Sequence, residues 1–172
     1  MAKSLQQPSL YELLEHHVSY EIDQMVASLM LLGNVKVPKS WERQDSWQKA
    51  LNNALMESFY VHARTLFEFF EKKRGARECT EATYKPFQKV DTSIWVRKLN
   101  NQMAHVLDGR TADDSLKIGD QDRIDMLNAL SDELEVFKMA LRPEYKSISI
   151  PTIQKITIQV SSQSATNAVQ FI

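Results

Sequence analysis

The sequence predicts an all-α protein: a four- to five-helix up-down bundle that ends in a short, β-prone C-terminal tail. Three observations support this class. Apolar residues recur at spacings of three and four over long stretches, which is the period of an amphipathic helix. Glycine and proline are scarce, with four and five copies in 172 residues, so helices can run uninterrupted. After Lys146 the composition changes to Ser, Thr, Ile, Gln and Val in alternation, which is typical of strands.

The first helix is expected to begin after Ser9 and to end at Gly33. Ser9 and Glu12 have the spacing of a capping box, in which each side chain bonds the backbone of the other. Gly33-Asn34 accepts the left-handed conformation that ends many helices. Trp41 and Trp47 flank the connection that follows, and we expect both rings to pin it to the bundle.

The second helix is predicted from about Trp47 to Arg74, with Ser46 as its cap and Gly75 as its stop. It carries one broad apolar stripe at helical spacing, which we expect to face the core. The stripe consists of Leu51, Leu55, Ser58, His62, Leu66 and Phe69, widened by Ala54, Phe59, Ala63, Phe67 and Phe70. A polar loop over residues 76–90 is expected next.

The third helix is predicted to start after Asp91 or Thr92 and to run to about Leu107, before Asp108-Gly109. The fourth is predicted from Asp120 to Leu141, where Pro143 prevents its continuation. These boundaries give a helical bundle domain over residues 9–142 and an extended tail over residues 143–172.

The tail contains two alternating runs, at residues 147–150 and 155–160, and Pro151 separates them. Residues 161–168 are expected to be unstructured. An isolated strand pair is marginal in water, and a helical bundle offers no sheet edge. We therefore expect the tail to pair with another chain in preference to folding back.

Composition excludes several classes of protein. The formal net charge of −1 argues against a dedicated polyanion binder, although it leaves room for a local basic patch. The single cysteine, Cys79, excludes an intramolecular disulfide, and it is expected at the surface. No apolar signal segment precedes Pro8, and no apolar run approaches the roughly 18 residues of a membrane span. A cytoplasmic location without membrane contact is expected.

Known cofactor and metal motifs are missing from the sequence. It contains no phosphate-binding glycine motif, no HExxH, no EF-hand loop and no CxxC. With four histidines and one cysteine, a conventional zinc site is not expected either. We predict neither a metal nor another cofactor.

The third helix has the most suggestive polar pattern. Arg97, Asn101 and His105 are spaced four apart and fall along one face. A guanidinium suits phosphate, an amide orients it, and an imidazole acts as acid or base near neutral pH. These three residues are candidates for metal-independent RNA cleavage, with Lys98 and Arg110 as candidates for substrate binding. The alternative is a polar network on an ordinary helix.

His62 and Arg64 lie in the second helix, two residues apart and so on different faces. His62 belongs to the apolar stripe, where a histidine satisfied by hydrogen bonds is expected. Arg64 is expected to form a salt bridge at the surface or between helices. Both are interpreted as structural polar residues.

Two segments resemble the HEPN superfamily: ALMESFYVHARTLFEFF in the second helix and RKLNNQMAHVLDGR in the third. The resemblance covers roughly residues 10–141 and implies a four- to five-helix bundle, commonly dimeric. Such proteins include ribonuclease toxins, antiviral nucleases and noncatalytic helical modules. Their active motif is an Arg followed, after four to six residues, by a His. Here seven residues separate Arg97 from His105, so only His105 matches.

Two functions remain open from the sequence. The first is a noncatalytic or degenerate HEPN-like interaction module in a bacterial defence or toxin–antitoxin system. The second is a metal-independent RNA endonuclease that uses His105 with Arg97 and Asn101. The expected partners are a second copy of the chain, a protein bound through the C-terminal tail, and RNA.

Overall fold

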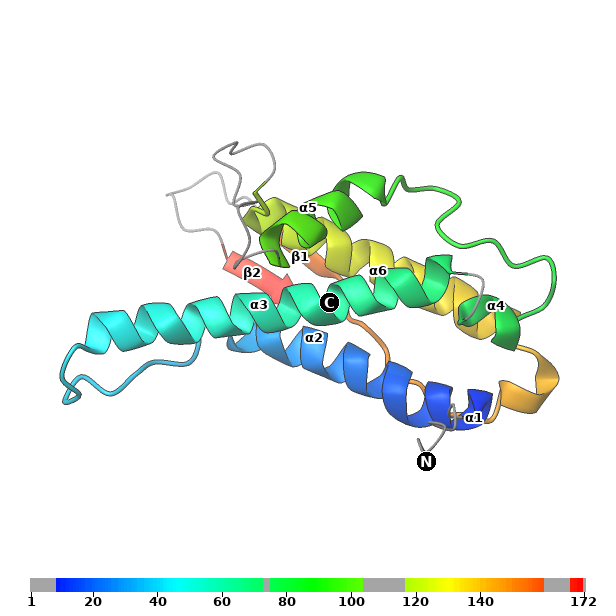
Figure 1. The fold of residues 1–172 in the computed structure, drawn as a ribbon, viewed down its shortest axis with the longest axis horizontal. Coiled ribbons are helices and arrows are strands. Elements are labelled where there is room, and N and C mark those ends of the chain that lie inside the picture. The colour runs from blue at the N-terminus through cyan, green and yellow to red at the C-terminus, as the bar shows by residue number, and fades with distance from the viewer. Residues whose placement is uncertain (1–8, 73–74, 104–116, 160–167, 172) are drawn as a thin grey trace, which may run out of the picture.

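The computed structural model describes residues 9–72, 75–103, 117–159 and 168–171. It confirms the all-α class: helices α2, α3, α5 and α6 pack as a bundle, and a short strand pair follows (Figure 1). In chain order the elements are α1 (Leu10–Glu12), η1 (Leu13–Val18), α2 (Ser19–Leu31), α3 (Gln44–Glu71), α4 (Ala76–Cys79), α5 (Ser93–Met103), α6 (Asp120–Ala140), η3 (Pro143–Tyr145), β1 (Ile156–Gln159) and β2 (Ala168–Phe171).

The first predicted helix is confirmed as one continuous helical segment. Ser9 and Glu12 form the capping box, with Ser9 Oγ accepting from the Glu12 N–H at 3.2 Å. The segment widens into a π-helix, η1, before it continues as α2. Gly33 follows with a φ of +76°, in the left-handed region that glycine adopts without strain.

Helix α3 begins and ends three residues earlier than the sequence predicts. It starts at Gln44, because Arg43 adopts a left-handed conformation with a φ of +59° and turns the chain into the helix. It ends at Glu71, and Lys72 is already extended. Both predicted boundaries, Trp47 and Arg74, were therefore wrong by one turn.

The core lies between the C-terminal half of α3 and the helices around it. Phe59 and Leu66 are buried as predicted, while His62 and Phe69 are only partly buried. Ring contacts join Phe70 to Phe137 of α6, with centroids 5.6 Å apart. Towards the start of α3 the predicted stripe is more exposed: Leu51 and Leu55 are partly buried, and Ala54 lies in solvent.

Cys79 is buried, so the prediction of a surface thiol was wrong. Its neighbour Thr80 forms an isolated antiparallel bridge with Leu141, and the N–H of Arg142 donates to the Cys79 carbonyl at 3.0 Å. The chain at the end of α6 therefore packs against the end of α4, which contains Cys79. Burial raises the pKa of the thiol to about 11.

The first alternating run of the tail forms no strand. Residues 147 and 148 lie in a turn, and residues 149–155 have no regular secondary structure. Four isoleucines, Ile148, Ile150, Ile153 and Ile156, are buried in the bundle core. Asn128 of α6 fixes the chain at Ile156, accepting from its N–H and donating to its carbonyl, both at 2.9 Å. Residues on both sides of the predicted boundary at 142 thus share one core.

The second alternating run does form a strand, and it pairs in cis. Strand β1 runs antiparallel to β2, with Ile156 opposite Phe171 and Gln159 opposite Ala168. The expectation of pairing with another chain was wrong because the sequence after residue 167 supplies the partner strand. Most of the segment expected to be unstructured, residues 161–168, lies outside the described residues.

The helices of the described ranges include none with the length and apolar character that crossing a bilayer requires.

Candidate functional site

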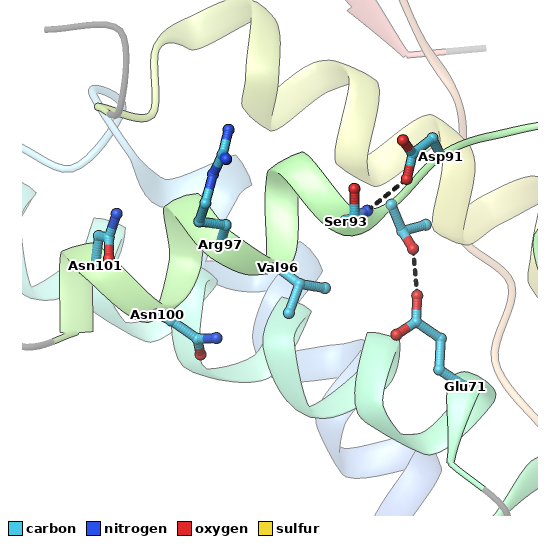
Figure 2. Close-up of a pocket in the computed structure, with 8 residues that line it drawn as sticks. Glu71, Asp91, Ser93, Val96, Arg97, Asn100 and Asn101 are labelled. Carbon is cyan, nitrogen blue, oxygen red and sulfur yellow. Dashed lines mark hydrogen bonds between the residues drawn. The ribbon is translucent and has the colours of Figure 1, made fainter.

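The candidate site is a polar cleft that runs along α5, where this helix passes the end of α3 (Figure 2). The cleft has a volume of about 500 Å³. Its lining residues are Glu71, Asp91, Thr92, Ser93, Val96, Arg97, Asn100 and Asn101. Seven of these eight come from α5 and the two residues before it, so the helix itself determines their spacing.

Hydrogen bonds fix the lining residues at the start of α5. The Thr92 hydroxyl donates to a Glu71 carboxylate oxygen, which joins the start of α5 to the end of α3. Asp91 accepts from the Ser93 N–H at 3.0 Å and caps the helix. The bonds from the side chain and backbone of Ser93 lower the pKa of Asp91, so this carboxylate is ionised at neutral pH.

Arg97 and Asn101 extend from the same side of α5, as their spacing of four predicts (Figure 2). Asn100 and Val96 extend from the side nearer α3. Asn100 was not among the residues predicted for the site, although its spacing of three from Arg97 places it within reach of the same cleft.

The charge of the cleft decides what it can hold. The lining residues carry one guanidinium, from Arg97, and two carboxylates, from Glu71 and Asp91. Such a balance disfavours a dense polyanion but suits a single phosphate beside Arg97. The amides of Asn100 and Asn101 offer donors and acceptors of the kind that pair with base edges. Among the lining residues that the structure describes there is no imidazole, thiol or amine.

Lys98 lies on a different face of α5 from the cleft and faces α6. Its Nζ donates to both carboxylate oxygens of Asp122, each at 2.9 Å, and only 12% of its side chain is exposed. Asp122 also accepts from the Gly119 N–H at 2.9 Å. The structure therefore places this predicted substrate-binding residue in an interhelical ion pair.

His105 and Arg110, the remaining predicted residues of the site, lie outside the described residues. The structure thus brings Arg97 and Asn101 together and does not place the predicted imidazole or the second arginine. Of the three candidate catalytic residues, the structure therefore describes Arg97 and Asn101.

His62 and Arg64 lie in α3, and each has a carboxylate partner. Nδ1 of His62 is 2.6 Å from Oε2 of Glu21 in α2, and the imidazole and the Tyr20 ring lie nearly perpendicular with centroids 5.6 Å apart. Nε of Arg64 donates to Glu68 at 3.1 Å, one turn along the same helix. His62 thus has a hydrogen-bond partner and Arg64 a salt bridge, as their interpretation as structural polar residues predicts.

Within the described ranges no three His, Cys, Asp or Glu side chains gather closely enough to hold a metal ion. Comparison of the chain with protein-family models, with curated proteins and with solved structures gave no match.

Proposed function

We propose that this chain is a noncatalytic, HEPN-like helical interaction module that binds RNA at the α5 cleft. One observation carries the proposal: Arg97 and Asn101 extend from one side of α5 and line an open polar cleft. A guanidinium binds one phosphate there, and the neighbouring amides contact a base. The resemblance of the sequence supplies the biological setting of a bacterial defence or toxin–antitoxin system in the cytoplasm.

RNA binding at this cleft is tested by fluorescence anisotropy with a labelled single-stranded RNA at low salt. Arg97→Ala should weaken binding by about five- to tenfold, because it removes one charge-assisted hydrogen bond to a phosphate. Asn101→Ala should weaken binding less. Arg77→Ala is the matched control, since Arg77 is an exposed arginine of α4 at a distance in sequence from α5. Equal loss of affinity in the Arg77 and Arg97 variants would contradict a specific cleft.

The second candidate function is a metal-independent RNA endonuclease. Its support is that Arg97 and Asn101 extend from the same side of α5, and that His105 follows Asn101 in the sequence at the same spacing of four. Cleavage of labelled RNA should then persist in EDTA and disappear in His105→Ala. His16→Ala is the control, since His16 is an exposed histidine at the other end of the chain. Activity that survives His105→Ala removes this candidate.

The proposal also includes a homodimer and a protein partner at the C-terminal strands. HEPN-like bundles are commonly dimeric, and a two-stranded ladder is a short platform to which a third strand can add. Light scattering of the purified chain tests the dimer directly. A mass of 19.8 kDa would identify a monomer and contradict this part of the proposal.

A further inference from the structure

The connection between α2 and α3 forms a tip that projects beyond the rest of the bundle. Helix α3 has 28 residues and spans roughly 42 Å, and its N-terminal end extends past the end of α2 (Figure 1). From Gln44 to Ser58 none of its residues is buried. We call residues 35–49 the hairpin tip.

A side-chain clamp holds the hairpin tip in shape. The carboxamide of Gln48 accepts from the Val37 N–H at 2.9 Å and donates to the Val35 carbonyl at 3.0 Å. The N–H of Trp41 donates to the Pro38 carbonyl at 3.1 Å and closes a turn. Backbone hydrogen bonds and the side chains of Gln44 and Gln48 therefore hold this connection. The sequence predicted that Trp41 and Trp47 would hold it.

The two indole rings are consequently left at the surface. Trp41 is 56% exposed and Trp47 is 53% exposed. Neither ring contacts another aromatic ring of the described residues, whereas Trp95 packs against Phe67 with centroids 6.0 Å apart. The two rings lie six positions apart in the sequence, and each offers an exposed aromatic face on which a flat partner such as a nucleic-acid base can stack.

The same tip concentrates positive charge. It carries Lys36, Lys39, Arg43 and Lys49 against Glu42 and Asp45, so four cations and two carboxylates give a local net charge of +2. The whole chain has a net charge of −1. None of these four cations forms an ion pair with a described residue, whereas Lys72, Lys98, Lys138 and Lys155 each do.

We infer that the hairpin tip is a second nucleic-acid site, which binds a single strand by stacking bases on Trp41 and Trp47. Lysine and arginine side chains around the rings contact the phosphates on either side. An anionic membrane fits less well, because Glu42 beside Trp41 and Asp45 near Trp47 would enter the headgroup layer with the rings. The inference does not rest on the α5 cleft.

The experiment measures anisotropy of a fluorescein-labelled oligouridylate with the full chain. Trp41→Ala and Trp47→Ala should each weaken binding by about tenfold, and the corresponding Trp→Phe variants should restore most of it because a ring remains. Tyr11→Ala removes another exposed ring, far from the tip in sequence, and should change nothing. Because Trp41 and Trp47 are exposed, their variants should keep the wild-type melting temperature.

Salt dependence supplies a second readout. A double variant, Lys39→Ala with Lys49→Ala, should reduce the slope of log K against log salt by about 0.7 for each phosphate that is no longer neutralised. The control pair is Lys85→Ala with Lys146→Ala, which are exposed lysines elsewhere. An unchanged slope in the Lys39 and Lys49 variant would overturn the assignment of phosphate binding to the tip.

The outcomes separate this site from the α5 cleft. Weaker binding in the tryptophan variants alone supports the tip and contradicts the cleft, and weaker binding in Arg97→Ala alone does the reverse. Wild-type affinity in both tryptophan variants overturns the inference. Vesicles of anionic phospholipid form the last arm: binding to vesicles without binding to the oligonucleotide would also overturn it.

Discussion

The phenol of Tyr84 donates a hydrogen bond to Oε1 of Glu133 at 2.5 Å, inside the bundle. The second oxygen of the same carboxylate accepts from the N–H of Phe87 at 2.7 Å. Phe87 has a φ of +48°, an uncommon value for a residue with a side chain, and its ring packs against Phe67 and Phe70. One buried carboxylate therefore holds the loop before α5 against α6.

Replacing this carboxylate should destabilise the fold and release the loop. Glu133→Ala leaves the Tyr84 hydroxyl and the Phe87 N–H without an acceptor, at a cost of roughly 1–3 kcal/mol for each buried donor. Urea denaturation measures the decrease in stability. Glu135→Ala is the control, since Glu135 is an exposed glutamate of the same helix. Equal stabilities of the two variants would contradict the structural role of Glu133.

The same carboxylate should give the stability an unusual dependence on pH. Burial raises the pKa of Glu133 in the folded protein, although its bonds to Tyr84 and Phe87 act in the opposite direction. The folded state then binds the proton more tightly than the unfolded state, so stability from this group is complete below about pH 4.5 and declines as pH rises. Glu133→Gln should remove that decline from the free energy of unfolding measured between pH 4.5 and 7.

The ion pair between Lys98 and Asp122 should contribute in the opposite sense. Burial alone would raise the pKa of Asp122, but the bonds from Lys98 and the Gly119 N–H outweigh it and lower the pKa. This stability is therefore present above the ordinary value of 3.8 and is lost as pH falls through the lowered pKa. Lys98→Ala should cost about 1.5–3 kcal/mol at pH 7.

Denaturation at pH 7 and in acid measures that cost, and Lys146→Ala is the exposed control. Because Lys98 is engaged with α6, its replacement should leave RNA affinity unchanged under conditions where the variant is folded. A clear decrease of RNA affinity in the folded Lys98→Ala variant would return this residue to the group of substrate-binding candidates.

The sequence predicted those features of the fold and the site that depend on residues close together in the chain. Local patterns predicted the long helices well, because apolar spacing and the Ser9 capping box act within a few residues. They also placed Arg97 and Asn101 on one side of α5. The pairing of Lys98 with Asp122 joins two helices through residues that lie 24 positions apart in sequence, and no local pattern could reveal it.

The errors have the same origin. Hydrogen bonds from the Gln48 side chain hold the connection that Trp41 and Trp47 were expected to hold by packing. No sequence pattern marks a glutamine that will bond the backbone in this way. Cys79 looked like a loop residue because its neighbours are polar, but the bridge between Thr80 and Leu141 brings it under the end of α6. The cis pairing of the tail required a second strand that begins at Ala168, beyond a polar segment.

The anchor of the tail provides a further prediction. Asn128→Ala removes both hydrogen bonds to the backbone of Ile156, which is buried, and should cost roughly 1–3 kcal/mol. Hydrogen exchange at the Ile156 amide should accelerate by at least about tenfold as β1 loosens. Asn53→Ala, an exposed position of α3, should alter neither quantity. An unchanged exchange rate at Ile156 would show that β1 is held without Asn128.

The buried thiol provides the last prediction. Burial raises the pKa of Cys79 to about 11, against a smaller opposite effect of Arg142, and the side chain is shielded from solvent. The native protein should therefore react with Ellman's reagent at pH 8 at least about a hundredfold more slowly than a free thiol, because little thiolate exists and access is blocked. In guanidinium chloride the reaction should become fast and stoichiometric.

A Cys79→Ala protein that carries Ala82→Cys is the control, since Ala82 is exposed three residues further on. That variant should react rapidly while folded. Rapid reaction of native Cys79 would show instead that the contact between α4 and the end of α6 opens readily.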